Sequence, residues 1–188
     1  MKYYIADCHI FHKNITKEGT NLDNRPFDTM ESMIDEFILG WKGILSNDDV
    51  YLVGDIFWKE GDRAVDLLGS LPGRKHLIRG NHDRCKNQKY TALFEDIHPY
   101  LEIKDGERRV ILCHYPILFW NAMHRGSILL YGHVHNTIEE DIFQRTLRGL
   151  DFEASAYNVG CMMPYMGWRP QTLDSIITKG DEYYSRIY

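Results

Sequence analysis

Seven side chains of the kinds that bind transition metals lie in five short clusters along this 188-residue chain. Mixed imidazole and carboxylate ligands suit manganese, iron, zinc or nickel better than calcium. A tetrahedral site takes four ligands, so seven candidates fit two divalent ions that share a bridging carboxylate. A lone histidine at a strand end is more often a hydrogen-bonded structural residue, but five clusters are hard to explain in that way. The candidate ligands are Asp7, His9, Asp55, Asn81, His114, His133 and His135.

The spacing within two clusters indicates how each would hold an ion. Asp7 and His9 are two residues apart, and so are His133 and His135. Residues i and i+2 of an extended backbone point to the same side. Each pair is therefore predicted to bind one ion.

The stretch Lys75–Asp83, KHLIRGNHD, adds two further polar groups. An apolar run ends at Gly80, which can turn sharply without steric cost. Asn81, His82 and Asp83 can then face a common cavity as an amide, an imidazole and a carboxylate that can hold the imidazole. The alternative is an ordinary polar turn, with Asp83 capping the helix that follows.

Stretches typical of strands precede each cluster, and early strands alternate with helical stretches. This alternation predicts βαβ units, and a second half richer in strand favours one layered α/β domain over residues 1–188. Ligands of such sheets bind beyond the carboxyl ends of the strands. The predicted strands are Lys2–Ala6, Asp49–Val53, Lys75–Arg79, Arg109–Cys113, Ser127–Tyr131, Tyr157–Val159 and Leu173–Ile177, and Leu93–Ile103 is read as a helix end followed by a strand.

Two helices are predicted, at Asp28–Leu45 and Gly61–Leu71. Asp28 and Glu31 have the spacing of a capping box at the start of the first one. Its apolar positions fall on one face, which indicates packing on a core. These positions are Met30, Met33, Ile34, Phe37, Trp41, Ile44 and Leu45.

Composition limits the classes of partner. A formal net charge of −5 argues against tight binding to duplex nucleic acid, although metal ions could still attract an anionic substrate. The apolar runs are too short for a membrane span, and Asp7 interrupts the N-terminus too early for a signal peptide, so we expect a cytoplasmic protein. The four cysteines form no C-x-x-C pair and are expected to be reduced thiols.

Taken in order, the clusters resemble the motifs of the calcineurin-like metallophosphoesterases. The matching motifs are Asp7-x-His9, Gly54-Asp55, Gly80-Asn81-His82-Asp83, His114 and Gly132-His133-x-His135. Five flanking segments are similar to those of small, uncapped bacterial and phage members. These segments are FHKNI, NRPF, HYPILFW, LYGHVHN and YNVGCM. The resemblance implies a β-sandwich flanked by helices in an αββα layering. It also implies one metal on Asp7, His9, Asp55 and His135 and another on Asp55, Asn81, His114 and His133, with Asp55 bridging.

The resemblance implies binuclear, metal-dependent hydrolysis of phosphomonoesters or phosphodiesters, with manganese favoured. Two ions about 3.5–4 Å apart can hold a hydroxide and a phosphoryl oxygen for in-line attack. His82 would protonate the leaving group, with Asp83 accepting its other ring proton. Cys8 stands where Ser or Thr is more usual; it flanks the ligands and is expected to be open to oxidation. The alternative is a non-catalytic scaffold of the same fold.

The expected partner is a small phosphorylated substrate such as a nucleotide. The open site could also be completed by a second copy in a homo-oligomer. An arginine can clamp a phosphate with two hydrogen bonds, and Trp120 could stack on a base, but ordinary packing explains each of these residues equally well. The candidate substrate contacts are His12, Asn14 and Arg25 in the first loop and Tyr115, Trp120, His124 and Arg125 before the last motif.

Overall fold

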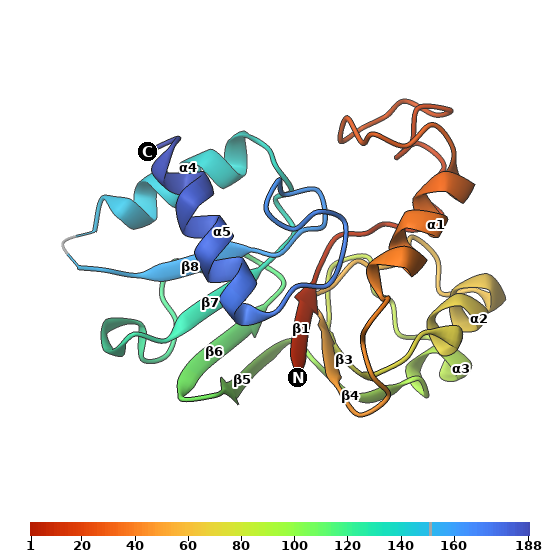
Figure 1. Ribbon diagram of the computed structural model, residues 1–188, viewed down its shortest axis with the longest axis horizontal. Helices are drawn as coiled ribbons and strands as arrows, with labels where there is room; N and C mark the ends of the chain where they lie inside the picture. Colours follow the sequence, from red (N-terminus) through yellow and green to blue (C-terminus); the bar gives the residue numbers. More distant parts are fainter. Residues whose placement is uncertain (151) are drawn as a thin grey trace.

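The computed structural model describes residues 1–150 and 152–188 and contains two four-stranded sheets packed face to face (Figure 1). The first sheet, in the order β1-β2-β3-β4, is entirely parallel. In the second, β5-β6-β7-β8, only β5 runs antiparallel to its neighbour. The strands are β1 (Lys2–Ile5), β2 (Asp49–Leu52), β3 (Arg74–Ile78), β4 (Phe94–His98), β5 (Tyr100–Asp105), β6 (Arg108–Cys113), β7 (Ile128–Tyr131) and β8 (Ser155–Asn158).

The helices are α1 (Met30–Gly40), α2 (Asp62–Ser70), α3 (Gln88–Thr91), α4 (Ile138–Arg148) and α5 (Leu173–Ser185), with a short 3-10 helix, η1 (Met123–Arg125). Helices α1 to α4 lie on the outer faces of the two sheets, and α5 packs along the junction between them. Within residues 1–150 and 152–188, no helix is both long and apolar enough to cross a membrane.

Alternation along the strands divides the apolar side chains into layers. In β6, Val110 and Leu112 pack between the sheets, whereas Ile111 and Cys113 pack on the outer face of the second sheet. Successive residues of a strand face opposite sides. Because both sides are covered, the strand is continuously apolar from Val110 to Cys113, the pattern of strands buried on both faces.

Different helices cover the two outer faces. Phe37 of α1, Leu68 of α2 and Tyr90 of α3 pack against the outer face of the first sheet. Phe143 and Leu147 of α4 pack against the outer face of the second. The order of layers is helix, sheet, sheet, helix, which confirms the predicted αββα arrangement.

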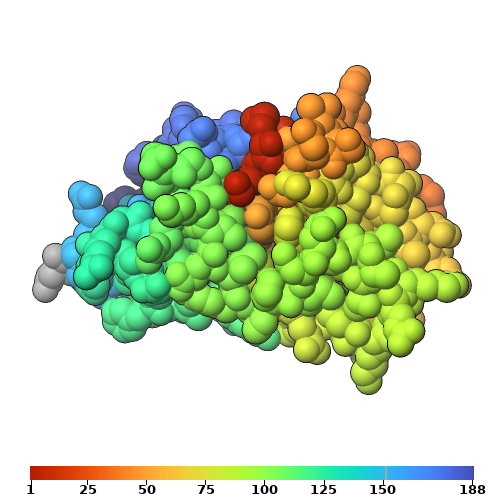
Figure 2. Space-filling model, turned by 90° about the horizontal axis from the view of Figure 1, so that it is seen from below, coloured from red at the N-terminus to blue at the C-terminus, as the bar shows by residue number. Residues whose placement is uncertain are grey.

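The two sheets are joined where the backbone continues beyond β1 and β8. The Ala6 amide donates to the Val159 carbonyl at 2.8 Å, and the Cys161 amide donates to the Ala6 carbonyl at 2.9 Å. Helix α5 contacts both β1 and β8 along this junction. Seen from below, the first residues of the chain, in red, lie at the surface between the two halves of the molecule (Figure 2).

The last predicted strand is wrong, because Leu173–Ile177 forms the start of α5. The side chain of Thr172 caps this helix by accepting a hydrogen bond from the Ser175 amide at 3.4 Å. Leu173, Ile176 and Tyr184 are buried at helical spacing. The β-branched pair at positions 176 and 177 favoured a strand locally, and packing on the sandwich overrides that preference.

Helix α4 was not predicted at all. Thr137 caps it, and acidic residues in the first turn and basic residues in the last suit the helix dipole. Its buried face, however, contains Glu140 and Gln144 beside Phe143 and Leu147. The two polar residues break the apolar period, so the second half contains two full helices where mainly strands were expected.

Helix α1 is shorter than predicted, since it begins at Met30 and ends at Gly40. Thr29 and Ser32 form the capping box instead of Asp28 and Glu31. The Leu45 side chain, predicted on the apolar face, is 61% exposed. Helix α2 and the remaining strands lie within a few residues of their predicted bounds, and Leu93–Ile103 divides into β4 and β5.

Candidate metal centre

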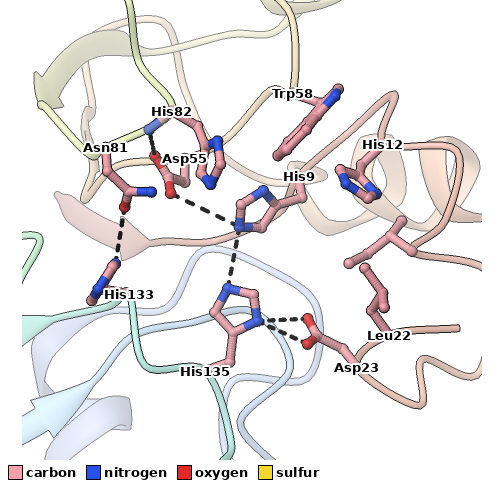
Figure 3. A pocket seen from close by; sticks show the side chains of 11 residues that line it. His9, His12, Leu22, Asp23, Asp55, Trp58, Asn81, His82, His133 and His135 are labelled. Carbon is pink, nitrogen blue, oxygen red and sulfur yellow. Dashed lines mark hydrogen bonds and ion pairs between the residues drawn. The ribbon is translucent and has the colours of Figure 1, made fainter.

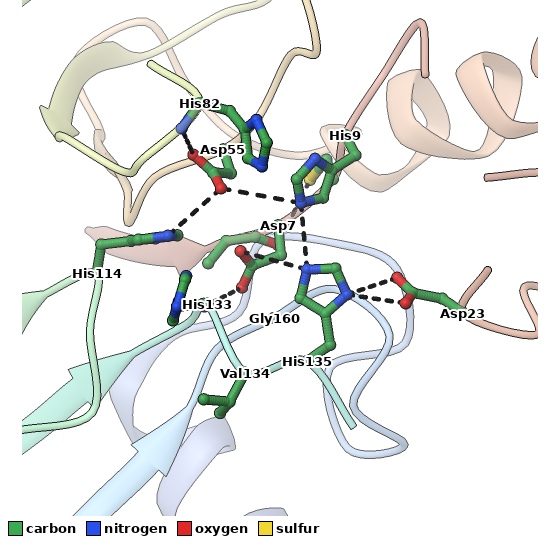
Figure 4. Close-up of polar contacts among 12 residues, drawn as sticks. Asp7, His9, Asp23, Asp55, His82, His114, His133, Val134, His135 and Gly160 are labelled. Carbon is green, nitrogen blue, oxygen red and sulfur yellow. Dashed lines mark hydrogen bonds and ion pairs between the residues drawn. The ribbon is translucent and has the colours of Figure 1, made fainter. Parts of the chain in front are cut away.

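The seven candidate ligands lie together at one rim of the sandwich (Figures 3 and 4). They follow β1, β2 and β3, which are neighbours in the first sheet, and β6 and β7, which are neighbours in the second. The carboxyl ends of neighbouring parallel strands meet at one edge, and the packing of the two sheets brings both edges to the same place.

The backbone that carries these ligands is not extended, so the predicted reason for the i, i+2 pairing is wrong. Asp7 and His9 have φ angles of 55° and 49°, and His133 and His135 have 72° and 52°. Asp55 has a φ of 55°. Such left-handed conformations are uncommon for residues with a side chain and concentrate at functional sites. The pairs converge because each ligand sits on a tightly turned loop after its strand.

Two glycines allow these loops to approach one another. A Cβ atom on Gly80 would overlap the carboxylate of Asp55, and one on Gly132 would overlap the carboxylate of Asp7. The loops after β3 and β7 can therefore pass the two acids only because these positions lack side chains.

One group of donors is formed by Asp7, His9 and His135, whose candidate ligand atoms lie within 4.8 Å of one another. The Nε2 atoms of His9 and His135 are 3.1 Å apart, and His135 Nε2 is 3.9 Å from Asp7 Oδ1. Asp7 is completely buried, and its Oδ1 atom has no hydrogen-bond partner within residues 1–150 and 152–188. An unpaired buried carboxylate oxygen is costly, and a cation among these donors would satisfy it.

A second group contains Asp55, Asn81, His114 and His133. His114 Nε2 lies 3.4 Å from Asp55 Oδ2 and 3.0 Å from Asn81 Oδ1, and His133 Nδ1 lies 2.9 Å from Asn81 Oδ1. Asp55 Oδ2 is also 3.9 Å from His9 Nε2 in the first group. The Asp55 carboxylate thus lies between the two groups.

A hydrogen bond to the backbone determines which nitrogen atom of the His114 ring carries the proton. Its Nδ1 atom is 2.9 Å from the carbonyl oxygen of Val53, which can only accept, so Nδ1 carries the proton. In the neutral ring, the lone pair of Nε2 then faces the oxygens of Asp55 and Asn81. These acceptors repel one another unless a proton or a cation lies among them, so the donor set fits a metal ion.

The pKa values reflect the same crowding. Burial lowers the pKa of His114, but the carboxylates of Asp55 and Asp7 outweigh it and raise that pKa to about 9. Burial raises the pKa of Asp7 to about 6, and burial together with the neighbouring His135 lowers the pKa of His9 to about 3. A divalent cation would neutralise the acids in place of protons, so its binding would release protons.

Arg25, predicted to contact substrate, is instead fully buried beneath the first loop. Its guanidinium group donates to the carbonyl oxygens of Cys8 at 2.6 Å and Asp7 at 2.8 Å. It also pairs with the Asp23 carboxylate at 2.9 Å. Arg25 therefore holds the backbone of the Asp7–His9 loop, and the prediction of a phosphate clamp is wrong.

Asp23 is a site residue that the sequence did not reveal. Its carboxylate lies 2.8 Å from His135 Nδ1 while also pairing with Arg25. Burial would raise the pKa of Asp23, but His135 and Arg25 reverse this and hold it well below its usual range. An ionised Asp23 fixes the proton of His135 on Nδ1 and leaves Nε2 free to bind a metal, which is the usual role of a carboxylate behind a histidine ligand.

Asp83 also differs from its predicted role. Its buried carboxylate accepts hydrogen bonds from the amides of Asp55 at 2.9 Å and Gly80 at 2.8 Å. No hydrogen bond to the His82 ring is found among the described residues, and no helix begins at Asp83. Asp83 joins the loops after β2 and β3, so the expectation that it orients the His82 ring is corrected.

His82 lines a cavity of about 290 Å³ together with several of the candidate ligands (Figure 3). Its ring centroid is 5.3 Å from that of His9 and 4.5 Å from that of Trp58. His12, a predicted substrate contact, lines the same cavity and packs edge-on against Trp58 at 4.0 Å. Trp58 was not predicted; an indole four residues after Gly54 carries no pattern that distinguishes it from a core residue.

The other predicted substrate contacts divide into two kinds. Tyr115 is 44% exposed, and its ring lies 4.5 Å from that of His133, at the edge of the centre. Trp120 is buried, and its indole donates to Ser127, so its role is packing. His124 lies in η1 and packs against Phe152 at 4.2 Å, and like Asn14 and Arg125 it is not among the described residues that line the cavity.

A buried polar network supports the loop that carries His133 and His135. The Asn158 side chain donates to the His135 carbonyl at 2.8 Å and to the Glu140 carboxylate at 3.0 Å. Glu140 in turn accepts hydrogen bonds from the hydroxyls of Tyr131 and Tyr184. Glu140 is one of the two polar residues that interrupt the apolar period of α4. Through Asn158 it helps to anchor the loop of His135.

Cys8, which flanks the candidate ligands Asp7 and His9 in the sequence, is buried. It lines a small cavity beside Cys161 and α1, away from the one over the ligands. All four cysteines are free thiols.

Comparisons with known proteins agree with this geometry. The family model described as calcineurin-like phosphoesterase matches residues 3–158. An uncharacterized protein of Methanocaldococcus jannaschii is 28% identical over 179 residues, covering 93% of this chain and 88% of its own. The gene 66 protein of Mycobacterium phage L5 is 27% identical, covering 71% and 77%. The crystal structure of a protein of unknown function from Aquifex aeolicus has a TM-score of 0.71 at 24% identity, covers 95% of this chain and 98% of its own, and shares the fold.

Proposed function

The chain belongs to the calcineurin-like phosphoesterase family, and on this basis we propose that it is a metal-dependent hydrolase of phosphoric ester bonds. The observation that carries the proposal is the convergence of two donor groups on the Asp55 carboxylate, which lies 3.4 Å from His114 Nε2 and 3.9 Å from His9 Nε2. When bound, two divalent cations would supply Lewis acidity that activates water and neutralises phosphate charge. These ligands suit manganese, iron, zinc or nickel, and we propose manganese because the family resemblance favours it.

In this proposal Asp55 is shared between the two ions. The first ion would be held by Asp7, His9, Asp55 and His135, whose donors include the unpaired Oδ1 of Asp7. The second would be held by Asp55, Asn81, His114 and His133. Asp23 and the Val53 carbonyl keep the protons of His135 and His114 on their Nδ1 atoms, so that Nε2 of each ring remains a ligand.

We assign His82 as the proton donor to the leaving group. Its ring lines the cavity over the donor groups, and its backbone amide donates to Asp55 Oδ1 at 2.9 Å, which fixes its position relative to the proposed bridge. Histidine can donate a proton near neutral pH. Trp58 packs against the ring and limits its movement.

A non-catalytic scaffold is the alternative. Such a protein needs no general acid and no complete set of ligands, whereas this chain has His82 and all seven ligand positions at one rim. A small phosphorylated molecule such as a nucleotide is the proposed substrate, because the cavity of about 290 Å³ is of the size that binds small ligands.

The test is hydrolysis of p-nitrophenyl phosphate and of bis(p-nitrophenyl) phosphate with added manganese, compared with the same protein in chelator. In addition, His82→Ala should lower kcat about 10²–10⁴-fold for esters of alkyl alcohols. The loss should be smaller for p-nitrophenyl esters, because p-nitrophenolate hardly needs a proton to leave. Lack of metal-stimulated hydrolysis of either ester would favour the scaffold, and equal losses for both kinds of leaving group would remove His82 from the role of acid.

A further inference from the structure

A second cavity adjoins the first one on the side of His82 and Trp58. It has a volume of about 590 Å³, and these two side chains line both cavities. The wall between the two cavities is therefore formed by the proposed proton donor and the indole packed against it. The remaining lining residues of the second cavity, which we call the lateral groove, are Lys59, Glu60, Gly61, Arg84, Lys86 and Asn87.

Three cations line the lateral groove without acidic partners. Lys59, Arg84 and Lys86 are exposed, and none of them forms an ion pair with any residue in the described ranges. Such a local excess of positive charge stands out in a chain whose formal net charge is −5. A cleft lined by one sign of charge attracts ligands of the opposite sign.

The one acidic residue of the groove is engaged elsewhere. The Glu60 carboxylate accepts hydrogen bonds from the amides of Cys85 at 2.7 Å and Lys86 at 3.2 Å. The Asn87 side chain also donates to the Glu60 carbonyl at 2.7 Å. Glu60 therefore fixes the backbone on which Arg84 and Lys86 are mounted, and its carboxylate leaves their charged groups free.

We propose that the lateral groove binds a second phosphate on the leaving group of the substrate. The proposal rests on the proposed function, because His82 protonates the leaving group and the groove lies directly beyond His82. The preferred substrates are then phosphoric esters whose alcohol carries another phosphate, with nucleoside bisphosphates as the representative class. The Trp58 indole, shared by both cavities, provides an apolar surface for the sugar or base between the two phosphates.

The test compares two monoesters that differ only in this second phosphate. Adenosine 5′-phosphate and adenosine 3′,5′-bisphosphate are assayed with manganese, and the ratio of their kcat/KM values is measured. The ratio is that of kcat/KM for the bisphosphate to kcat/KM for the monophosphate. It should fall in the combined variant Lys59→Gln, Arg84→Gln, Lys86→Gln. Exposed charge pairs contribute about 0.2–1 kcal/mol each, so we expect a loss of roughly 1.4- to 5-fold per cation and roughly 3- to 160-fold for all three.

A control variant removes three exposed lysines from other surfaces, Lys42→Gln, Lys104→Gln and Lys179→Gln. It has the same net charge as the groove variant and should keep the wild-type ratio. If both variants lower the ratio equally, overall charge is responsible and the groove proposal is overturned. If the wild type hydrolyses p-nitrophenyl phosphate but does not prefer the bisphosphate, the groove proposal fails while the proposed function stands.

Binding measured without catalysis separates the two proposals in the opposite case. Adenosine 3′,5′-bisphosphate is titrated calorimetrically into each protein in chelator. An affinity that falls at least about 3-fold in the groove variant and stays unchanged in the control supports the groove even if no ester is hydrolysed. Equal affinities for all three proteins would overturn it.

Discussion

Replacing Arg25 by methionine should destabilise the protein rather than weaken substrate binding. The guanidinium group is fully buried and makes its hydrogen bonds to the carbonyl oxygens of Asp7 and Cys8 and to the Asp23 carboxylate. Methionine has a similar length but no donor. The change would leave the buried Cys8 carbonyl unpaired and the Asp7 carbonyl with only the weak Cys161 thiol donor at 3.4 Å. It would also remove the positive charge beside Asp23.

The expected size follows from these contacts. Removing one partner of a buried ion pair costs about 3–5 kcal/mol, and each unpaired buried acceptor costs about 1–3 kcal/mol. These costs overlap, so we expect a loss of about 3–5 kcal/mol from a total that is typically about 5–15 kcal/mol. With an m-value of about 3 kcal/mol/M, the urea midpoint should fall by about 1–2 M.

Equilibrium unfolding in urea measures this loss of stability. The matched control is Arg109→Met, because Arg109 is exposed and forms no ion pair within the described residues. That control should change the free energy of unfolding by less than about 0.5 kcal/mol. The double variant with Asp23→Asn should lose less than the sum of the single losses, because it removes the stranded charge. An unchanged urea midpoint with a raised KM would refute this reasoning and restore Arg25 as a substrate contact.

Two further predictions concern the metal centre. Metal content is measured after reconstitution with manganese. Asp55→Asn should lower it from about two equivalents toward zero, whereas Asp7→Asn should mainly empty one site. Full metal content and activity in Asp55→Asn would show that Asp55 is not the bridge. Manganese at 100 times its dissociation constant should stabilise the wild type by about 2.7 kcal/mol per site. This raises Tm by about 5–10 °C per site for a chain of this size. A Tm that is the same in chelator and in manganese would contradict binding to the folded state.

The layered α/β class and the positions of the candidate ligands at strand ends could be predicted because both depend on local patterns, whereas the αββα order came from the family resemblance. Buried parallel strands are apolar without interruption, and each of the five functional strands ends abruptly in a polar cluster. That signal needs no knowledge of the partner strand. The bounds of β2 and β6 could be read within about one residue for the same reason.

The helices of the second half could not be predicted from apolar period, because the sandwich buries polar groups there. Glu140 and Gln144 face the core from α4, where tyrosine hydroxyls and Asn158 satisfy them. A polar side chain at a core position looks in the sequence like a surface residue. Its partners come from β7, β8 and α5, which are distant along the chain.

The predicted roles of Arg25 and Asp83 were wrong because buried charged residues were again interpreted without their distant partners. The structure shows that both residues hold loop backbones. Five ligand-bearing residues have left-handed backbone, a conformation that each would adopt only at some cost outside this setting. The loops therefore need anchors, and buried charged groups supply them: Arg25 binds the carbonyls of Asp7 and Cys8, and Asp83 binds the amides of Asp55 and Gly80. Charged residues next to a motif suggest chemistry at the substrate, but here they hold the loop backbones in place. The ligands can then remain in position without relying on the metal to organise them.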